Sequence, residues 1–475
     1  MSGDSTSGHR FHPSLLREYD MRGVFGETLT ARDAWAVGRS FASVVARRGG
    51  RCVAVGRDGR LSAPTLEAAL IEGLGAGGID VQRLGLCPTP AMYYWVASQP
   101  DVDGGIEVTG SHNPKDHNGF KFDLGGQPFF GDDIVELGRI AAAGDWADGD
   151  RAGGDRIAGT CESVDWTEAY CARIVRVLDG MDPPHGAGLT IGWDAGNGAA
   201  GPAIEALTRR LPGTHVLFHT RVDGHFPNHH PDPTVPENCQ DLVDAVARGN
   251  IDIGFAFDGD GDRLGVIDGR GRIIWGDQLL LMLAEDLLQR RPNARIMADV
   301  KSSQVLFDRI AALGGEAIMA PTGHALIKSG MKQSGALLGG ELTGHLFLAD
   351  GFYGHDDALY AALTLLAAAA RRGSTLTAWR DGLPETCATP DLRLPVPGID
   401  PFAAIARLKA RLDGAGIGYV SIDGARVTTP DGWWLLRASN TQAMLTARAE
   451  SGDAAGLTRV LADMDHWLAQ VGVAR

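Results

Sequence analysis

The chain has 475 residues, of which 44% are hydrophobic and 22% are charged, and its formal net charge at pH 7 is −15. This length exceeds what one ordinary core can bury, so we expect three or four domains. The acidic balance argues against nonspecific binding to nucleic acid or to an anionic membrane, because contacts with phosphates need a basic face.

The sequence favours a cytoplasmic protein without a membrane segment. The N-terminal stretch lacks the apolar core of a secretory signal. The most apolar helical run, residues 358–370, is too short to span a bilayer, and acidic and basic residues at its two ends fit a buried helix. The six cysteines contain no CxxC pair, so we expect neither a zinc site nor a disulfide framework. The expected assembly is a monomer or a weak homo-oligomer.

Strand-like and helix-like runs alternate along the first 370 residues or so. In three places a short β-rich run is followed by an amphipathic run, which is typical of mixed or parallel sheets covered by helices. The three pairs are RCVAVGRD with PTLEAALIEGLGAGG, GLTIGWDAGNG with PAIEALTRRL, and ARIMADV with SSQVLFDRIAAL.

Changes in composition mark the domain boundaries. Residues 141–160 are rich in glycine and aspartate without apolar periodicity, so we expect a surface connection there. After about residue 384 the pattern becomes that of a small α+β domain, with strands between two helices. We predict three α/β domains with mixed sheets and a C-terminal α+β domain, at residues 1–166, 167–272, 273–384 and 385–475.

The strongest chemical signal is FAFDGDGDRLGVID, residues 255–268, between two apolar strands. Asp258, Asp260 and Asp262 alternate with glycines, and in an extended segment alternate side chains point the same way. Three converging carboxylates repel one another unless a cation lies among them, and their oxygens suit Mg²⁺ or Ca²⁺. A solvated hairpin turn is the alternative. An EF-hand does not fit, because the glycine and glutamate required at its sixth and twelfth positions are absent.

Ser111 lies in a turn directly after a predicted strand. The proline in SHNP disfavours helix at Asn113, so the serine is presented on a loop. A serine in such a turn commonly does no more than hydrogen-bond the backbone. Its neighbours His112, Lys115 and Lys121 favour a second interpretation, because a phosphate on Ser111 would offer about two negative charges to cations and to a metal ion. A phosphoryl carrier is therefore a candidate.

Four motifs in order, VTGSHNP with NGFK, DGDGDR, GELTGH and RASNT, resemble those of the α-D-phosphohexomutases, specifically the bacterial phosphomannomutase/phosphoglucomutase branch. Further stretches that look familial are REYDMRG, VGRDGRLS, GLCPTPAMYYW, FPNHHPDP and PTGHALIK, so the resemblance covers nearly the whole chain. It implies four domains around a central active-site cleft, each giving one loop to the site.

The resemblance also implies a reaction. Ser111 is phosphorylated and binds the Mg²⁺ held by Asp258, Asp260 and Asp262. Phosphoserine 111 converts hexose 1-phosphates and hexose 6-phosphates of glucose or mannose into one another. The bound hexose 1,6-bisphosphate turns end for end between two transfers, and glucose 1,6-bisphosphate is the expected intermediate and activator. Besides Ser111, the expected catalytic residues are Lys121, Arg263 and His324, of which Lys121 or His324 assists proton transfer.

The other motif residues are expected to bind the substrate. By resemblance, Glu341 and Thr343 hydrogen-bond the sugar hydroxyls with His345 nearby. A guanidinium fork, hydroxyls and turn amides bind the phosphate that is not transferred; they belong to Arg437, Ser439, Asn440 and Thr441. The remaining expected cleft residues are Tyr19, Arg22, His112 and Lys301.

Two departures from the family pattern and three rival functions remain. Leu342-Thr343 replaces a common Met-Ser pair, which keeps the hydroxyl. Gln442-Ala443 stands where a proline commonly ends the phosphate loop, so we expect a more mobile turn and predict that Ala443→Pro tightens substrate binding modestly. GELTGH and RASNT point away from phosphoglucosamine mutases. A phosphatase and a noncatalytic sugar-phosphate sensor are the other rivals. Nothing in the sequence distinguishes glucose from mannose phosphates.

Overall fold

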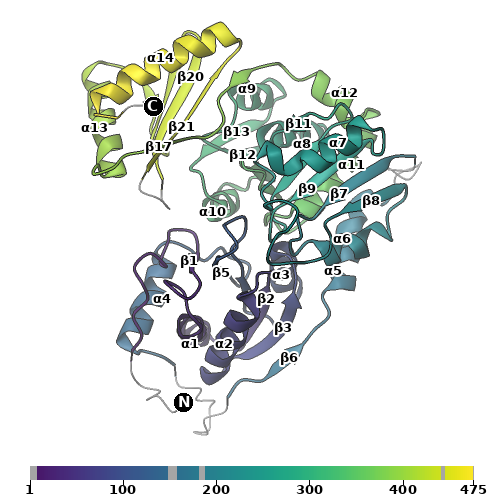
Figure 1. Cartoon of the computed structure of the whole chain (residues 1–475), viewed down its shortest axis with the longest axis vertical. Coiled ribbons are helices and arrows are strands. Elements are labelled where there is room, and N and C mark those ends of the chain that lie inside the picture. The colour runs from purple at the N-terminus through teal and green to yellow at the C-terminus, as the bar shows by residue number, and fades with distance from the viewer. Residues whose placement is uncertain (1–7, 148–157, 181–187, 440–443, 474–475) are drawn as a thin grey trace.

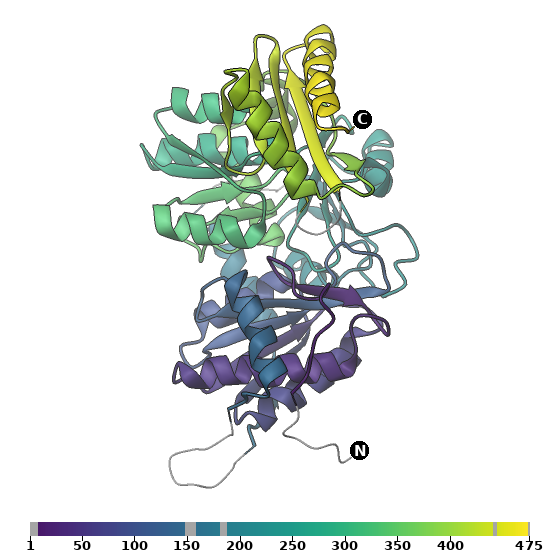
Figure 2. The same ribbon diagram turned by 90° about the vertical axis from the view of Figure 1, so that its left-hand side faces the viewer.

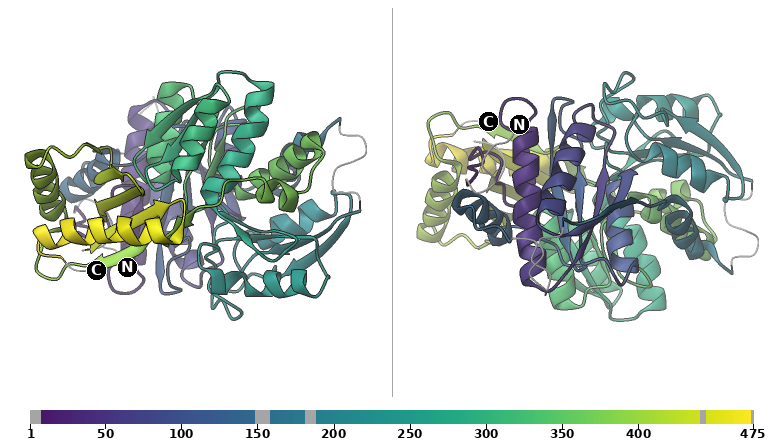
Figure 3. Two further views of the ribbon diagram at one scale, coloured as in Figure 1. Left: turned by 90° about the horizontal axis from the view of Figure 1, so that it is seen from above. Right: turned by 90° about the horizontal axis from the view of Figure 1, so that it is seen from below.

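The computed structural model describes residues 8–147, 158–180, 188–439 and 444–473. These residues form four sheets, and each sheet with its helices is called a unit below. The first unit lies at one end of the molecule, below the other three in Figures 1 and 2. The second and fourth units lie on opposite sides of the third, as the views along the vertical axis also show (Figure 3).

The first sheet has six strands, β1 (Met21–Val24), β2 (Cys52–Arg57), β3 (Asp80–Leu86), β4 (Gly104–Val108), β5 (His117–Leu124) and β6 (Cys161–Ser163). Their order is β1-β5-β4-β2-β3-β6, and only β5 runs antiparallel to its neighbours. The serine loop, residues 109–116, therefore joins two adjacent central strands, β4 and β5. The helices are α1 (Ala31–Arg47), α2 (Ala63–Ala76), α3 (Thr89–Ser98) and α4 (Asp132–Ala143).

The second sheet has five strands, β7 (Thr190–Asp194), β8 (Thr214–Phe218), β9 (Ile253–Phe257), β10 (Leu264–Ile267) and β11 (Ile273–Ile274). Their order is β11-β10-β9-β7-β8, with β8, β7 and β9 parallel and the other two added antiparallel. Strand β11 lies just beyond residue 272, where a domain boundary is expected, and it still pairs with β10 of the second sheet. That boundary remains a proposal. The helices are α5 (Thr167–Val175), α6 (Gly201–Thr208), α7 (Gln240–Ala247) and the 3-10 turns η1 (Arg176–Leu178) and η2 (Pro236–Cys239).

The third sheet has four strands, β12 (Arg295–Asp299), β13 (Glu316–Ala320), β14 (Leu338–Gly340) and β15 (Leu346–Leu348), in the order β13-β12-β14-β15. Its helices are α8 (Gly276–Arg290), α9 (Gln304–Ala312), α10 (His324–Ser334), α11 (Ala358–Arg372) and α12 (Leu376–Asp381). Helix α11 is the expected apolar helix. Asp357 caps its first turn by accepting the Tyr360 amide, and Arg371 and Arg372 lie in its last turn, where they favour the helix dipole.

The fourth sheet is antiparallel throughout, with β16 (Cys387–Ala388), β17 (Leu392–Pro395), β18 (Tyr419–Val420), β19 (Ala425–Thr429), β20 (Gly432–Ala438) and β21 (Met444–Ser451). The helices α13 (Pro401–Gly414) and α14 (Ala454–Gln470) contribute buried apolar side chains to its core, among them Leu408, Leu412, Met464 and Leu468. The predicted fold class, three α/β units with mixed sheets and a C-terminal α+β unit, is confirmed.

The first unit has a core of its own between its sheet and α1, α2 and α4. Its helix α3 enters a second, larger core that it shares with α5, α6, α8 and α11 of the second and third units. The fourth unit has a core of its own. It meets the third through a small cluster of Val300, Trp433 and Leu435, beside which the Arg426 guanidinium lies 3.7 Å from the Trp433 ring centroid. Among the described residues no helix is long and apolar enough to cross a membrane, and the six cysteines are free.

Candidate active site

The three aspartates of the loop between β9 and β10 converge as expected, but for a different reason. Residues 259–261 form a turn rather than an extended segment, with the Gly261 amide donating to Asp258 O at 3.1 Å and Gly261 at φ +75°. The expectation of an extended segment is therefore wrong. The turn folds Asp258, Asp260 and Asp262 together, so that one carboxylate oxygen of each lies within 4.8 Å of the others, and all three side chains are fully buried.

Ser111 faces this loop from the first unit. Its Oγ donates to Asp258 Oδ2 at 2.9 Å, and only 1% of the residue is exposed. The two loops also touch through their backbones, since a Cβ on Gly259 would lie 2.4 Å from Ser111 O. Ser111 has φ +50°, a left-handed conformation that costs a non-glycine residue roughly 1–2 kcal/mol. Such strain persists only where surrounding contacts hold the backbone, as the contacts of Ser111 with Asp258 and Gly259 do here.

Arg60, which sequence reasoning missed, holds the serine loop from behind. Its buried guanidinium donates to the carbonyl oxygens of Ser111 (2.7 Å), Asn113 (2.6 Å), Pro114 (2.5 Å) and His117 (2.9 Å). Its Nε donates to Asp58 Oδ2 at 3.1 Å. A Cβ on Gly110 would lie 2.5 Å from the guanidinium carbon, so glycine is required there. The stretch VGRDGRLS contained this residue, but nothing in it indicated the distant carbonyl partners.

Lys121 of β5 crosses to the aspartate loop. Its ammonium donates to Asp260 Oδ2 at 2.6 Å and also to Asp262 Oδ2. Burial opposes the charged ammonium, but the carboxylates of Asp260 and Asp262 outweigh it and raise the pKa of Lys121. Burial likewise opposes ionisation of Asp260, yet Lys121 lowers the pKa of that carboxyl. Thr89, at the start of α3 and also missed, donates its hydroxyl to Asp260 Oδ2 at 2.5 Å.

The same loop reaches the third unit through Arg263. Its Nε donates to His345 Nε2 at 2.9 Å, which leaves the proton of a neutral His345 on Nδ1, 3.0 Å from Asp356 Oδ2. His324 lies beside His345, with ring centroids 5.6 Å apart. Burial and the nearby Lys328 ammonium hold the pKa of His324 well below its ordinary value, so this imidazole is neutral.

The remaining expected cleft residues are spread over several contacts. Arg22 of β1 donates to Asp20 Oδ2 at 2.7 Å and to Gly110 O at 3.4 Å, which places it beside the serine loop. The Tyr19 hydroxyl donates to Thr322 O in the third unit at 2.9 Å. His112 Nδ1 lies 2.8 Å from Asp232 Oδ2, and burial, aided by Arg263, lowers the pKa of His112 to about 3. Lys301 is directed to the fourth unit, 3.2 Å from Asp391 Oδ2.

The sugar loop of the sequence prediction follows β14. Glu341 is 4% exposed and accepts the Gly323 amide at 2.6 Å and the Thr343 hydroxyl at 3.0 Å. Gly323 has φ +141°, and a Cβ there would meet the Tyr19 ring at 2.7 Å. The turn of residues 341–345 is closed by the Glu341 amide donating to His345 O at 2.9 Å. Glu341, Thr343 and His345 are thus brought together.

The expected phosphate loop is described in part. Arg437 of β20 donates through Nε to Asp423 Oδ2 at 2.8 Å, and the same oxygen accepts the Thr322 amide of the third unit at 3.2 Å. The Ser439 amide donates to Met444 O at 3.0 Å. Asn440 and Thr441 lie outside the described residues, as does the Gln442-Ala443 departure. Asp423, which the sequence analysis missed, fixes Arg437 relative to the third unit.

The aspartate loop has the donor set of a site for a hard divalent cation. It offers only carboxylate oxygens, and Asp260 Oδ1 and Asp262 Oδ1 are buried without a hydrogen-bond partner among the described residues. Crowding of the three carboxylates adds to burial and raises the pKa values of Asp258 and Asp262. A cation removes both penalties, and oxygen ligands with open positions suit Mg²⁺ or Ca²⁺.

Family models of phosphoglucomutase/phosphomannomutase match the chain in order: alpha/beta/alpha domains I, II and III over residues 13–147, 168–271 and 275–387, and the C-terminal domain over residues 392–466. The chain belongs to the phosphoglucomutase/phosphomannomutase family. The resemblance drawn from the sequence motifs is thereby confirmed.

Relatives of this family match almost the full chain. A phosphoglucomutase of Neisseria gonorrhoeae is 41% identical over 451 residues, which cover 94% of this chain and 95% of that protein. A phosphomannomutase/phosphoglucomutase of Pseudomonas aeruginosa is 40% identical over 447 residues, which cover 94% of both. The crystal structure of a phosphoglucomutase/phosphomannomutase family protein from Burkholderia thailandensis has a TM-score of 0.89 at 40% identity and covers 97% of this chain and 98% of that chain.

Proposed function

We propose that this protein is a phosphomannomutase/phosphoglucomutase that interconverts hexose 1-phosphates and hexose 6-phosphates. The observation that carries the proposal is the 2.9 Å contact between Ser111 Oγ and Asp258 Oδ2, which joins a strained serine to a loop able to hold a divalent cation. The family membership and the close relatives named for this activity support it. Glucose and mannose phosphates are the proposed substrates, and the cytoplasm, where free cysteines persist, is the proposed location.

In the proposed mechanism Ser111 carries the phosphoryl group. Asp258, Asp260 and Asp262 would hold Mg²⁺, which supplies neutralising charge to the phosphoryl oxygens when it is bound. Lys121 and Arg263 add positive charge from two directions. The hydroxyl of the sugar monophosphate attacks the phosphorus of phosphoserine 111 and the P–Oγ bond breaks, while the hydroxyl proton passes by way of a base to Ser111 Oγ, which keeps the electron pair of the broken bond. His324, whose imidazole is neutral, is our candidate for that base, with Lys121 as the alternative.

The product of this step is a hexose 1,6-bisphosphate, proposed as the intermediate and, for glucose, as the activator. It must turn end for end, so that its other phosphate returns to Ser111. One set of residues then has to bind either end of the sugar. We propose that Glu341, Thr343 and His345 bind hydroxyls, while Arg437 and Ser439, with Asn440 and Thr441, hold the phosphate that is not transferred. Tyr19, Arg22, His112 and Lys301 complete the proposed binding residues.

A coupled assay with glucose 1-phosphate and, separately, mannose 1-phosphate tests the proposal. The assay contains Mg²⁺ and a trace of glucose 1,6-bisphosphate and compares wild type with Ser111→Ala. We expect flux to the 6-phosphates in wild type and its loss in the variant, because the variant lacks the hydroxyl that contacts Asp258 and would carry the group. Ser14→Ala, at an exposed serine, is the matched control and should behave as wild type.

Two outcomes would contradict the proposal. Full mutase flux in Ser111→Ala would show that another group carries the phosphoryl. Release of inorganic phosphate by wild type, without any 6-phosphate sugar, would make the protein a phosphatase instead. Mass spectrometry of the intact chain after incubation with glucose 1,6-bisphosphate should find one phosphate on Ser111 in wild type and none in the variant.

A further inference from the structure

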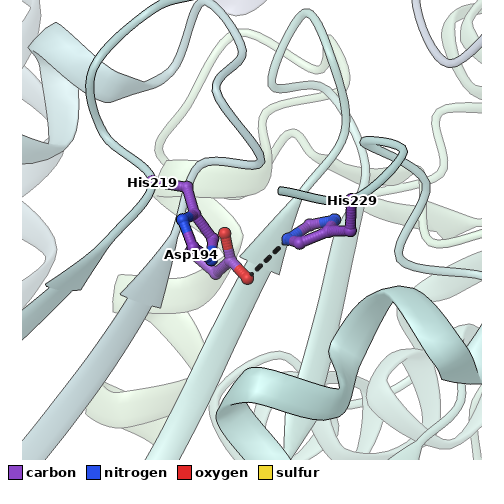
Figure 4. Close-up of side chains that lie close together, drawn as sticks. All are labelled: Asp194, His219 and His229. Atoms are coloured by element: carbon purple, nitrogen blue, oxygen red, sulfur yellow. Dashed lines mark hydrogen bonds and ion pairs between the residues drawn. The ribbon is translucent and has the colours of Figure 1, made fainter. Parts of the chain in front are cut away.

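A cluster of one aspartate and two histidines lies in the second unit, apart from the serine and aspartate loops. Asp194 ends β7 and is fully buried, and His219 directly follows the parallel neighbour β8. His229 comes from the loop of residues 226–233, the FPNHHPDP motif that the proposed mechanism does not use. One ligand atom of each residue lies within 4.8 Å of the others (Figure 4).

His229 has hydrogen-bond acceptors at both ring nitrogens. Its Nδ1 lies 3.0 Å from His230 O, so that nitrogen bears a proton. Its Nε2 lies 2.9 Å from Asp194 Oδ2, which is also an acceptor (Figure 4). The space between Nε2 and Oδ2 therefore calls for a cation, either a second proton or a metal ion.

The surroundings match those of metal-binding histidines. A ligating histidine usually donates its other ring N–H to a carboxylate or a backbone carbonyl, which fixes the ring. His229 has such a partner in His230 O, and His219 lies 2.7 Å from Asp241 Oδ2 through Nε2. The other oxygen of Asp194 accepts the Gly196 amide at 2.8 Å. The carboxylates of Asp194 and Asp241 supply two negative charges beside two imidazoles.

We propose that Asp194, His219 and His229 form a second metal site, for a transition-metal ion of the Zn²⁺ class. Imidazole nitrogens with one carboxylate suit Zn²⁺, Co²⁺ or Ni²⁺, whereas the aspartate loop, with oxygens alone, suits Mg²⁺. Two ligands about 2.0–2.1 Å from a tetrahedral ion lie roughly 3.3 Å apart. The observed 2.9 Å between His229 Nε2 and Asp194 Oδ2 needs only a small widening to admit the ion.

The ion would fix the loop that supports the serine loop. His230 Nε2 lies 2.6 Å from His112 O, and Asp232 Oδ2 lies 2.8 Å from His112 Nδ1, so residues 226–233 contact the residue next to Ser111 from two points. A loop tied at His229 to the ends of β7 and β8 is less free to move away. The site is therefore structural, and its occupancy is expected to raise the temperature of unfolding by preferential binding to the native state.

Co²⁺ binding to the full chain in excess Mg²⁺ tests this proposal, because Mg²⁺ occupies the aspartate loop and leaves the nitrogen site to Co²⁺. Visible absorption reports nitrogen-bound Co²⁺. We expect wild type to bind one Co²⁺ that Mg²⁺ does not displace. His219→Asn should bind it at least about tenfold more weakly, the lower end of what loss of a partner of a ligating histidine costs. Asparagine suits the residue's φ of +51° and so preserves the backbone.

Two controls make the result decisive. Asp258→Asn, in the aspartate loop, should keep the Mg²⁺-resistant Co²⁺, and His12→Asn, at an exposed histidine, should bind as wild type does. Zn²⁺ in excess Mg²⁺ should raise the unfolding temperature of wild type but not that of His219→Asn. The proposal is overturned if wild type binds no Mg²⁺-resistant Co²⁺, which would leave a protonated His229–Asp194 pair. It is equally overturned if His219→Asn binds as tightly as wild type or if Asp258→Asn abolishes the binding.

Discussion

Replacing Arg60 with lysine tests whether one buried guanidinium holds the serine loop in its reactive shape. Arginine offers five N–H donors in a planar fork, whereas lysine offers three donors on a compact head. The Arg60 side chain makes five hydrogen bonds, three of them to carbonyl oxygens of the serine loop and one to the carbonyl oxygen of His117, which follows the loop. A lysine that reached three of these acceptors would still leave two without a donor. At about 1–3 kcal/mol for each buried group, Arg60→Lys should destabilise the fold by about 2–6 kcal/mol.

The same change should slow the proposed reaction. Ser111 is held at φ +50° partly by the bond from Arg60 to its carbonyl oxygen. Once that bond is lost, the roughly 1–2 kcal/mol of left-handed strain favours other loop conformations. A change of this size lowers the population of the reactive loop by a factor of about 5–30. We expect kcat to fall by that factor and KM to change less, because the proposed contacts of Glu341, Thr343 and Arg437 lie in the third and fourth units and His112 is the proposed binding residue within the serine loop.

Two measurements on the purified full chain check this reasoning. Urea unfolding gives the change in stability, and steady-state kinetics with glucose 1-phosphate separate kcat from KM. Arg139→Lys is the matched control, since Arg139 is exposed and, among the described residues, forms its ion pair with its helix neighbour Glu136, and it should leave both quantities unchanged. An Arg60→Lys variant with wild-type stability and wild-type kcat would refute the role assigned to Arg60.

Three further predictions concern other parts of the site. Gly323→Ala should lower kcat/KM at least tenfold, because φ +141° and a ring atom of Tyr19 at 2.7 Å leave no room for a Cβ; unchanged kinetics would contradict this. Burial raises the pKa of Asp357 to about 7, so the folded state keeps a proton that the unfolded state loses near pH 4. The free energy of unfolding should therefore fall by up to about 4 kcal/mol as pH rises from 4 to 7. Asp357→Asn should abolish most of that slope in urea unfolding at several pH values. EDTA should abolish mutase flux and Mg²⁺ restore it, whereas full flux in EDTA would remove the metal from the proposal.

The sequence indicated the groups that bear chemistry more readily than the groups that hold them in place. Asp258, Asp260 and Asp262 stand close together in a recognisable pattern, and Ser111 stands out by its turn and its basic neighbours. Even there, the three carboxylates converge because a turn with glycines brings them together, and the alternation of side chains expected for an extended strand did not predict that turn. Strand and helix assignments succeeded where apolar runs and turn residues agreed, as they do for β2, β9, β10 and α11.

The supporting residues could not be found because their partners lie far away along the chain. Thr89 donates to a carboxylate 171 positions later, and the Thr322 amide donates to Asp423 across 101 positions. Each is an ordinary polar residue in its own segment. The carbonyl oxygens that Arg60 binds belong to the backbone, so no residue type in the sequence indicates them. Contacts of this kind follow from how the units pack, which local patterns do not specify.

The division of the core also fits the demands of the proposed reaction. The aspartate loop and His345 belong to the second and third units, which share one apolar core, and the first unit, which carries Ser111, enters that core through α3. Packing that is costly to disturb therefore limits how far these groups can separate. Arg437 belongs to the fourth unit, which has its own core and meets the third mainly through polar contacts, among them the Thr322 amide on Asp423 and the Arg426 guanidinium on Val300 O at 2.6 Å. A phosphoryl transfer needs units joined by a shared core, because the phosphoryl donor and its cation must keep a fixed distance from each other. An intermediate that turns end for end favours a fourth unit with a separate core. Arg437 and the phosphate loop can then shift by a small movement at the interface while the reacting groups remain in place.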